Sequence, residues 1–265
     1  MSVIGLVRRS DFGLDYYVEN GNADALPPIV ALHPWFGCWQ FWLPVVSRYP
    51  ERKWILVDLY SGAKSIPADA GAFDAMATAV AGVIGEVSEG PAVLAGNSTG
   101  GLLAQTIAIA GDPLLEALVL VGTGASAEGV SAPFRAALRE WLGAEGTPPA
   151  EQTRQLVRSL LAHLPDEDTF ATYVDAVVSA DYPFLRAVLT GLLGRDVTDR
   201  LPSIGVPTLV IRGEQDEART KEHVRILCAG IPDCTAVEIA AAGHSPMVDQ
   251  PAVFEAALRL FLHDG

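Results

Sequence analysis

Cysteine is scarce in this chain, which has only Cys38, Cys228 and Cys234 in 265 residues and no C-x-x-C pair. So low and odd a count argues against a disulfide framework or a zinc cluster, and we expect reduced thiols and no bound metal. The N-terminus lacks the apolar segment of a secretory signal, and no apolar run reaches the roughly 18 uninterrupted residues of a membrane span. These absences predict a cytoplasmic protein with no membrane partner.

Positive charge is also in short supply. The chain has 18 lysines and arginines against 32 aspartates and glutamates, which gives a formal net charge of −14. Nucleic acids and anionic membrane surfaces repel such a chain, so neither is expected as a partner. Half of the residues are hydrophobic and 19% are charged, enough apolar material for a large core and too little charge for a disordered chain. We expect a monomer or homodimer acting on a small molecule, without a cofactor.

Short apolar runs alternate with helical patterns along the chain. Each run has four to six residues and is apolar throughout, as expected of parallel strands covered on both faces. The alternation predicts an α/β fold with a doubly wound, mostly parallel sheet. The expected strands are 28–32, 54–59, 92–95, 117–121, 208–211 and 235–239, and the expected helices are 68–88, 101–110, 218–229 and 252–263.

Residues 126–201 interrupt this alternation. They carry four consecutive amphipathic helical patterns and no convincing strand. An insertion of this size between two strands predicts a helical cap (lid) over one edge of the sheet. Residues 1–125 and 202–265 would then form the core domain.

The sequence Gly96-Asn97-Ser98-Thr99-Gly100 lies between an apolar strand and an apolar helix. In that context G-x-S-x-G is typical of a sharp turn, the nucleophile elbow, that exposes a serine. The two flanking glycines avoid a collision of side chains with neighbouring backbone. A glycine-rich phosphate loop is the alternative, but no P-loop lysine follows. We therefore predict that Ser98 is a catalytic nucleophile.

A serine nucleophile needs a histidine base, which in turn needs an acid to orient it. His244 follows the last strand at the carboxyl edge of the sheet, where sites of open α/β folds assemble. Asp216 follows the preceding strand at the same edge, and the order Ser98, Asp216, His244 is the one expected of this fold. We predict these three as a catalytic triad. The alternative acids are Glu214, Glu217 and Glu128.

The loop after the first predicted strand is rich in aromatic residues. It supplies the backbone N–H of Trp35 as a candidate oxyanion donor, with that of Thr99 as the second, whereas Pro34 has no N–H to donate. His33, at the start of this loop, is expected to have a structural role. Aromatic residues beside a nucleophile often line an apolar pocket. The predicted substrate-binding residues are Phe36, Cys38, Trp39, Trp141, Phe170 and Met247.

From about residue 28 to residue 262 the chain resembles the α/β-hydrolase superfamily. The spacing of Gly213 and Asp216, and the pair Gly243-His244 followed by Pro251, match the pattern of that family. The resemblance implies a serine hydrolase with a Ser-His-Asp triad and an oxyanion hole.

The first loop departs from the family pattern. His33-Pro34 stands where the family usually has His-Gly, although Trp42 is in register nine residues after the histidine. With an aromatic residue, Trp35, at this position, the loop resembles that of the perhydrolase, non-haem haloperoxidase and aryl esterase branch of the family. The sequence Gly-Asn-Ser-x-Gly-Gly also resembles meta-cleavage C–C hydrolases and some lactonases.

These features predict hydrolysis of a small to medium, mostly apolar carboxylic ester or lactone through an acyl-enzyme. A thioesterase, an amidase or a C–C bond hydrolase would use the same residues. A lyase or a ligand receptor of the same fold, and an interaction module with an accidental motif, are alternatives from other classes.

Overall fold

The computed structural model describes residues 7–19, 26–88, 90–128 and 130–263. Within these residues one sheet of eight strands has the order β1-β2-β4-β3-β5-β6-β7-β8. Neighbouring strands from β4 to β8 in this order run parallel, whereas β2 pairs antiparallel with both β1 and β4. The strands are β1 (Val7–Arg9), β2 (Asp15–Glu19), β3 (Ile29–Leu32), β4 (Trp54–Asp58), β5 (Ala92–Asn97), β6 (Leu115–Val121), β7 (Thr208–Gly213) and β8 (Cys234–Ile239).

The six predicted strands are all present, and the α/β fold class is confirmed. The central strands β3 and β5 are buried along their whole length, which explains their uninterrupted apolar sequences. The strands β1 and β2 were not predicted. All three residues of β1 are exposed, and β2 begins and ends with an acidic residue and has one buried residue, so neither has the apolar run of a buried strand.

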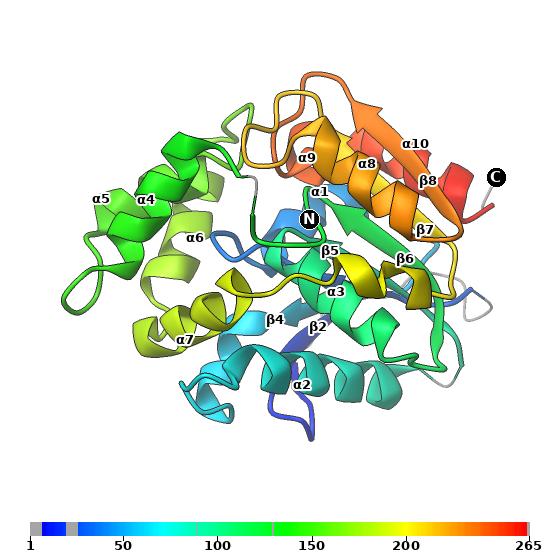
Figure 1. Ribbon diagram of the computed structural model, residues 1–265, viewed down its shortest axis with the longest axis horizontal. Coiled ribbons are helices and arrows are strands. Elements are labelled where there is room, and N and C mark those ends of the chain that lie inside the picture. The colour runs from blue at the N-terminus through cyan, green and yellow to red at the C-terminus, as the bar shows by residue number, and fades with distance from the viewer. Residues whose placement is uncertain (1–6, 20–25, 89, 129, 264–265) are drawn as a thin grey trace.

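Helices cover both faces of the sheet. In Figure 1, α2, α3 and α8 lie in front of it, and α1, α9 and α10 lie behind it. All four predicted core helices are present. The four are α2 (Ala72–Val87), α3 (Thr99–Ile109), α8 (Lys221–Gly230) and α10 (Pro251–Phe261). The short helices α1 (Leu43–Val46) and α9 (Pro246–Asp249) were not predicted, and neither were the 3₁₀ helices η1 (Trp39–Trp42), η2 (Leu59–Lys64) and η3 (Thr198–Ser203).

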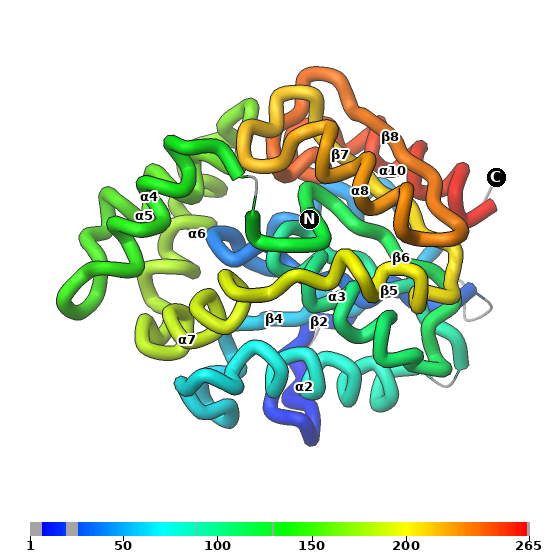
Figure 2. Tube along the Cα trace, viewed as in Figure 1, coloured from blue at the N-terminus to red at the C-terminus, as the bar shows by residue number. Residues whose placement is uncertain are grey.

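Four helices lie between β6 and β7, where the sequence predicted an insertion. Figure 2 traces the chain as it leaves the sheet after β6, passes through these helices on one side of the molecule, and returns to β7. An antiparallel β-bridge between Ser126 and Asp196 joins the two ends of this segment. Whether 126–201 forms a separate cap domain stays a prediction. We call the four helices the helical insertion: α4 (Ala132–Leu142), α5 (Ala150–Arg158), α6 (Glu167–Val178) and α7 (Tyr182–Leu193).

Side-chain caps begin three helices of the insertion. Ser131, Asp166 and Asp181 each accept a hydrogen bond from the backbone N–H three residues later, at the starts of α4, α6 and α7. Among the described residues no single helix is long and apolar enough to cross a membrane. The bent pair α6 and α7 passes a test of length and composition when taken together, with an angle of 84° between them.

Two cysteines form a disulfide, so the expectation that all three are reduced was wrong. Cys228, in the last turn of α8, is bonded to Cys234, the first residue of β8, with a Cα–Cα distance of 5.2 Å. The short turn between helix and strand brings the two residues together, which their spacing in the sequence did not reveal. Cys38 is free and buried.

Candidate active site

Ser98 lies at a strained turn between β5 and α3. Its backbone has φ 56° and ψ −113°, a conformation that side-chain-bearing residues rarely adopt. A Cβ on Gly96 would lie 2.3 Å from the carbonyl oxygen of Gly100, and a Cβ on Gly100 would lie 2.6 Å from that of Leu32. The turn therefore requires glycine at both flanking positions, as the motif predicted.

Asn97, the residue before Ser98, links this turn to the loop of His244. Its Nδ2 donates hydrogen bonds of 3.0 Å to the carbonyl oxygens of Val121 and of His244. Its Oδ1 accepts a bond of 2.9 Å from the hydroxyl of Ser245. Asn97 is fully buried, so these bonds fix the backbone of His244 relative to the turn. Sequence reasoning did not identify this role.

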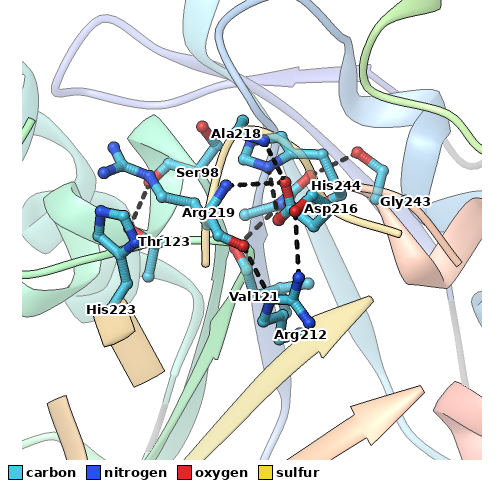
Figure 3. A network of polar contacts seen from close by, with 12 residues as sticks. Ser98, Val121, Thr123, Arg212, Asp216, Ala218, Arg219, His223, Gly243 and His244 are labelled. Atoms are coloured by element: carbon cyan, nitrogen blue, oxygen red, sulfur yellow. Dashed lines mark hydrogen bonds and ion pairs between the residues drawn. The ribbon is translucent and has the colours of Figure 1, made fainter. Parts of the chain in front are cut away.

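His244 and Asp216 are joined by a buried hydrogen bond. The Nδ1 of His244 lies 2.9 Å from Oδ2 of Asp216, and both side chains are almost inaccessible. Figure 3 shows the two residues and Ser98 within one network of polar contacts. The Nε2 of His244 is buried and has no hydrogen-bond partner among the described residues, so it is available to accept a proton.

The carboxyl group of Asp216 is held by backbone N–H groups as well as by the histidine. Its Oδ1 accepts bonds of 2.8 Å and 2.9 Å from the N–H groups of Ala218 and Arg219. Burial raises the pKa of Asp216, but His244 and these two N–H groups oppose it, and the net pKa is below the usual value. The carboxylate is therefore ionised at neutral pH and can orient and stabilise a protonated His244.

The alternative acids do not occupy this position. Glu214, Glu217 and Glu128 are exposed, and no bond joins them to His244 in the part of the chain that the structure describes.

Arg212 holds the loop that carries Asp216. Its guanidinium donates to the carbonyl oxygens of Glu214, Asp216 and Arg219.

The two predicted oxyanion donors, Trp35 and Thr99, line the same pocket as Ser98. Thr99 is the first residue of α3, so its N–H has no acceptor within the helix. Trp35 is held from both sides, because its carbonyl accepts a hydrogen bond from the Tyr60 hydroxyl and its indole N–H donates to the carbonyl of Leu185 at 3.2 Å.

His33 makes structural contacts beneath this loop. Its ring is fully buried, with Nδ1 at 2.8 Å from the carbonyl oxygen of Pro34 and Nε2 accepting from the N–H of Leu59 at 3.1 Å. This pair of bonds requires the neutral ring with the proton on Nδ1. Burial lowers the pKa of His33 to about 4.

A pocket of about 250 Å³ opens beside Ser98, between the core and the helical insertion. Aromatic and aliphatic side chains line most of its wall. Four charged residues also line it, namely Arg135 and Arg139 of α4, Arg219 and Glu128. The aromatic and aliphatic lining is Pro34, Trp35, Phe36, Ala127, Val130, Phe134, Leu138, Leu142, Leu160, Leu189, Leu192 and Leu193.

Of the six predicted substrate-binding residues, Phe36 lines this pocket, and the other five lie outside its lining. Trp39 stacks on Tyr17 at 3.7 Å between ring centroids, and Trp141 packs edge-on against Phe36. The remaining three, Cys38, Phe170 and Met247, are buried core residues. Aromatic residues serve the core and a pocket equally well, so the sequence could not separate the two uses.

Residues with side chains suited to a metal do not cluster in the described parts of the chain, where no group of three or more histidine, cysteine, aspartate or glutamate residues has a suitable arrangement. Cys38 is not a candidate nucleophile either. Its thiol is fully buried, and desolvation raises its pKa far above the ordinary value, so the reactive thiolate is disfavoured.

Several known proteins are similar to this chain. An alignment of 194 positions, which covers 66% of the chain, is 31% identical to the polyketide synthase ThaQ of Burkholderia thailandensis, but it spans only 9% of the length of that protein. A protein of Azorhizobium caulinodans named as a carbamate hydrolase, RutD, is 24% identical over 91% of this chain and 96% of its own length.

Solved structures share the fold. One described as an aryl esterase, from Burkholderia cenocepacia, superposes with a TM-score of 0.82 at 20% identity and 98% coverage of both chains. The model of the alpha/beta hydrolase family matches residues 29–257, which is most of the chain. With the doubly wound sheet and the strained serine turn already described, this match shows that the chain belongs to the alpha/beta hydrolase family and is an enzyme of that family.

Proposed function

We propose that this enzyme hydrolyses small to medium carboxylic esters or lactones through a covalent acyl-enzyme on Ser98. The observation that carries the proposal is the position of Ser98. It sits on a strained turn and lines a pocket whose wall is mostly aromatic and aliphatic, and the same polar network holds a buried His244–Asp216 pair. This is the combination of nucleophile, base and acid that acyl transfer requires.

The steps follow from these positions. The Oγ of Ser98 attacks the substrate carbonyl carbon while Nε2 of His244 takes its proton, and Asp216 stabilises the resulting imidazolium. The backbone N–H groups of Trp35 and Thr99 donate to the oxyanion that forms. His244 then protonates the departing alcohol. Water, deprotonated by His244, attacks the acyl carbon and releases the acid and Ser98.

The helical insertion would act as the cap of the pocket, since α4 and α7 supply most of its aliphatic lining. A pocket of about 250 Å³ suits a compact substrate. A monomer or homodimer in the cytoplasm, with no nucleic-acid or membrane partner, remains our expectation.

A substrate panel tests this proposal. Short-chain phenyl esters, a δ-lactone, a thioester and an anilide of one acyl group should be compared at neutral pH, with Ser98→Ala as the control for background hydrolysis. We expect turnover of the esters and the lactone, with slower turnover of the anilide. Turnover of the anilide alone would assign the enzyme to C–N bonds, and equal rates for wild type and Ser98→Ala would overturn the proposal.

A further inference from the structure

Arg219 lines the pocket of Ser98 and is itself more than nine-tenths buried. Its Nη1 donates to the carbonyl oxygens of Ser126 and Glu128, at 3.0 Å and 3.3 Å. Its Nε and Nη2 make no hydrogen bond to any other described residue, and no carboxylate lies within ion-pair distance of its guanidinium among those residues. A buried guanidinium with nitrogens left over is poised to bind an anionic group.

The nearest buried carboxylate does not complete the pair. The charge of Asp216 acts on Arg219, but its two oxygens are occupied by His244 and by the backbone N–H groups of Ala218 and Arg219 itself. Burial lowers the pKa of Arg219 to about 10, and Asp216 partly opposes this shift. The guanidinium therefore remains charged at neutral pH.

Two further arginines reinforce this positive lining. Arg135 and Arg139 are four residues apart on one face of α4, together with apolar residues that also line the pocket. The Nη2 of Arg135 donates to the carbonyl of Val130 at 3.1 Å, and no bond to another described residue engages the side chain of Arg139. Glu128 is the opposing charge in the lining, and its exposure to solvent weakens its effect on the buried Arg219.

The chain as a whole is strongly acidic, with a net charge of −14, so a pocket lined by three arginines and one glutamate reverses the sign of its surroundings. General acidity cannot account for this local reversal. The next step rests on the proposed esterase or lactonase function. We propose that the natural substrate is an ester or lactone that also carries an ionised carboxylate, and that Arg219 binds this carboxylate beside the nucleophile. The apolar lining would then hold the carbon chain between the reacting carbonyl and that carboxylate.

In this proposal Arg219 determines substrate specificity. The alternative is that Arg219 has only a structural role, through its bonds to Ser126 and Glu128. The two roles give different results when substrates differ only in charge. A structural defect slows neutral and anionic substrates together. Loss of carboxylate binding slows only the anionic one.

The test compares carboxylate and primary-amide members of two ester pairs. In the first pair, monophenyl adipate and its adipamate ester, the group lies on the acyl side. In the second pair, the hexanoyl esters of 4-hydroxybutanoate and of its amide, it lies on the alcohol side. For wild-type enzyme we expect kcat/KM to favour the carboxylate in at least one pair by about tenfold or more, the effect of one charge-assisted hydrogen bond.

In Arg219→Gln this preference should fall to near one, while the neutral amide substrate keeps most of its rate. Arg219→Lys should keep part of the preference, and Arg186→Gln, on the exposed face of α7 outside the pocket lining, should keep all of it. A wild-type ratio near one in both pairs, with both members hydrolysed, would overturn the inference and leave the esterase proposal intact. No Ser98-dependent turnover of any member would instead count against the proposed function. A preference unchanged in Arg219→Gln would also overturn the inference.

Discussion

The side-chain amide of Asn97 donates a hydrogen bond of 3.0 Å to the backbone carbonyl of His244. The residue before the candidate nucleophile therefore holds the residue proposed as its base, although 147 positions separate them. This bond explains why asparagine, with its two donors and one acceptor, suits a position where a small apolar residue would satisfy the strand equally well.

Asn97→Ala should reduce kcat more than it changes KM, because the backbone of His244 loses its anchor while the pocket lining is unchanged. The variant also leaves the carbonyl of His244 without its donor, while that of Val121 keeps the bond from the N–H of Ser98, so unfolding should become easier by about 2 kcal/mol. Gln105→Ala is the matched control, since its buried amide also donates to two carbonyls, those of Gly101 and Gly124. It should lose similar stability in urea unfolding but keep kcat. An equal fall in kcat in both variants would contradict a specific role for Asn97.

Asp216→Asn should lower kcat by about 10⁴-fold, because an amide can neither fix the required histidine tautomer nor stabilise its charge. Steady-state hydrolysis of a phenyl ester measures this effect. Glu214→Gln and Glu217→Gln, at exposed neighbouring positions, should retain wild-type rates. A comparable loss in either glutamate variant would move the acid to that residue.

Gly96→Ala should destabilise the fold, because its Cβ would lie 2.3 Å from a backbone oxygen that cannot move without distorting α3. We expect a cost of about 3 kcal/mol in chemical unfolding. Gly194→Ala, where no atom lies within 4 Å of the added Cβ, is the control and should cost far less. Equal stabilities for the two variants would mean that the turn at Ser98 is looser than described.

Stability should fall between pH 7 and pH 5 because of His33. Its folded-state pKa is depressed to about 4 from an ordinary value of 6.5, so the unfolded chain binds a proton in this range and the folded chain does not. The contribution of His33 is therefore largest above pH 6.5 and declines as the pH falls toward 4. The loss by pH 5 should be about 2 kcal/mol.

Urea unfolding of wild type and His33→Gln at the two pH values checks this prediction. The variant loses the bonds to Pro34 and Leu59 and should be less stable at pH 7. Its stability should nevertheless change less between pH 7 and pH 5 than that of wild type. Parallel pH dependences in the two proteins would show that His33 is not the group responsible.

The sequence predicted the parts of this enzyme that depend on local pattern. Uninterrupted apolar runs identified the buried strands, and the glycines around Ser98 identified a turn that the structure shows to be strained. The positions of Asp216 and His244 followed from a topological rule, since parallel strands end at one edge of the sheet.

What the sequence did not predict depends on contacts between distant segments. Aromatic residues of the first loop were expected in the pocket, but Trp39 packs on Tyr17 of the unpredicted strand β2. Most of the aliphatic and arginine lining comes from α4, α7 and the loop after Asp216. These segments are far apart in the sequence, and only the tertiary structure brings them together beside Ser98. Arg219 offered a weak signal, as a basic residue three positions after the predicted acid at the functional edge.

The central claim is that Ser98 is an activated nucleophile, and covalent labelling tests it most directly. Folded wild-type enzyme should react with a fluorophosphonate at one site, and mass spectrometry of its peptides should locate the label on Ser98. Ser98→Ala should remain unlabelled, and His244→Ala should react far more slowly because the serine then lacks its base. Folded wild-type enzyme that stays unlabelled, or that carries the label elsewhere with Ser98 unmodified, would contradict the account.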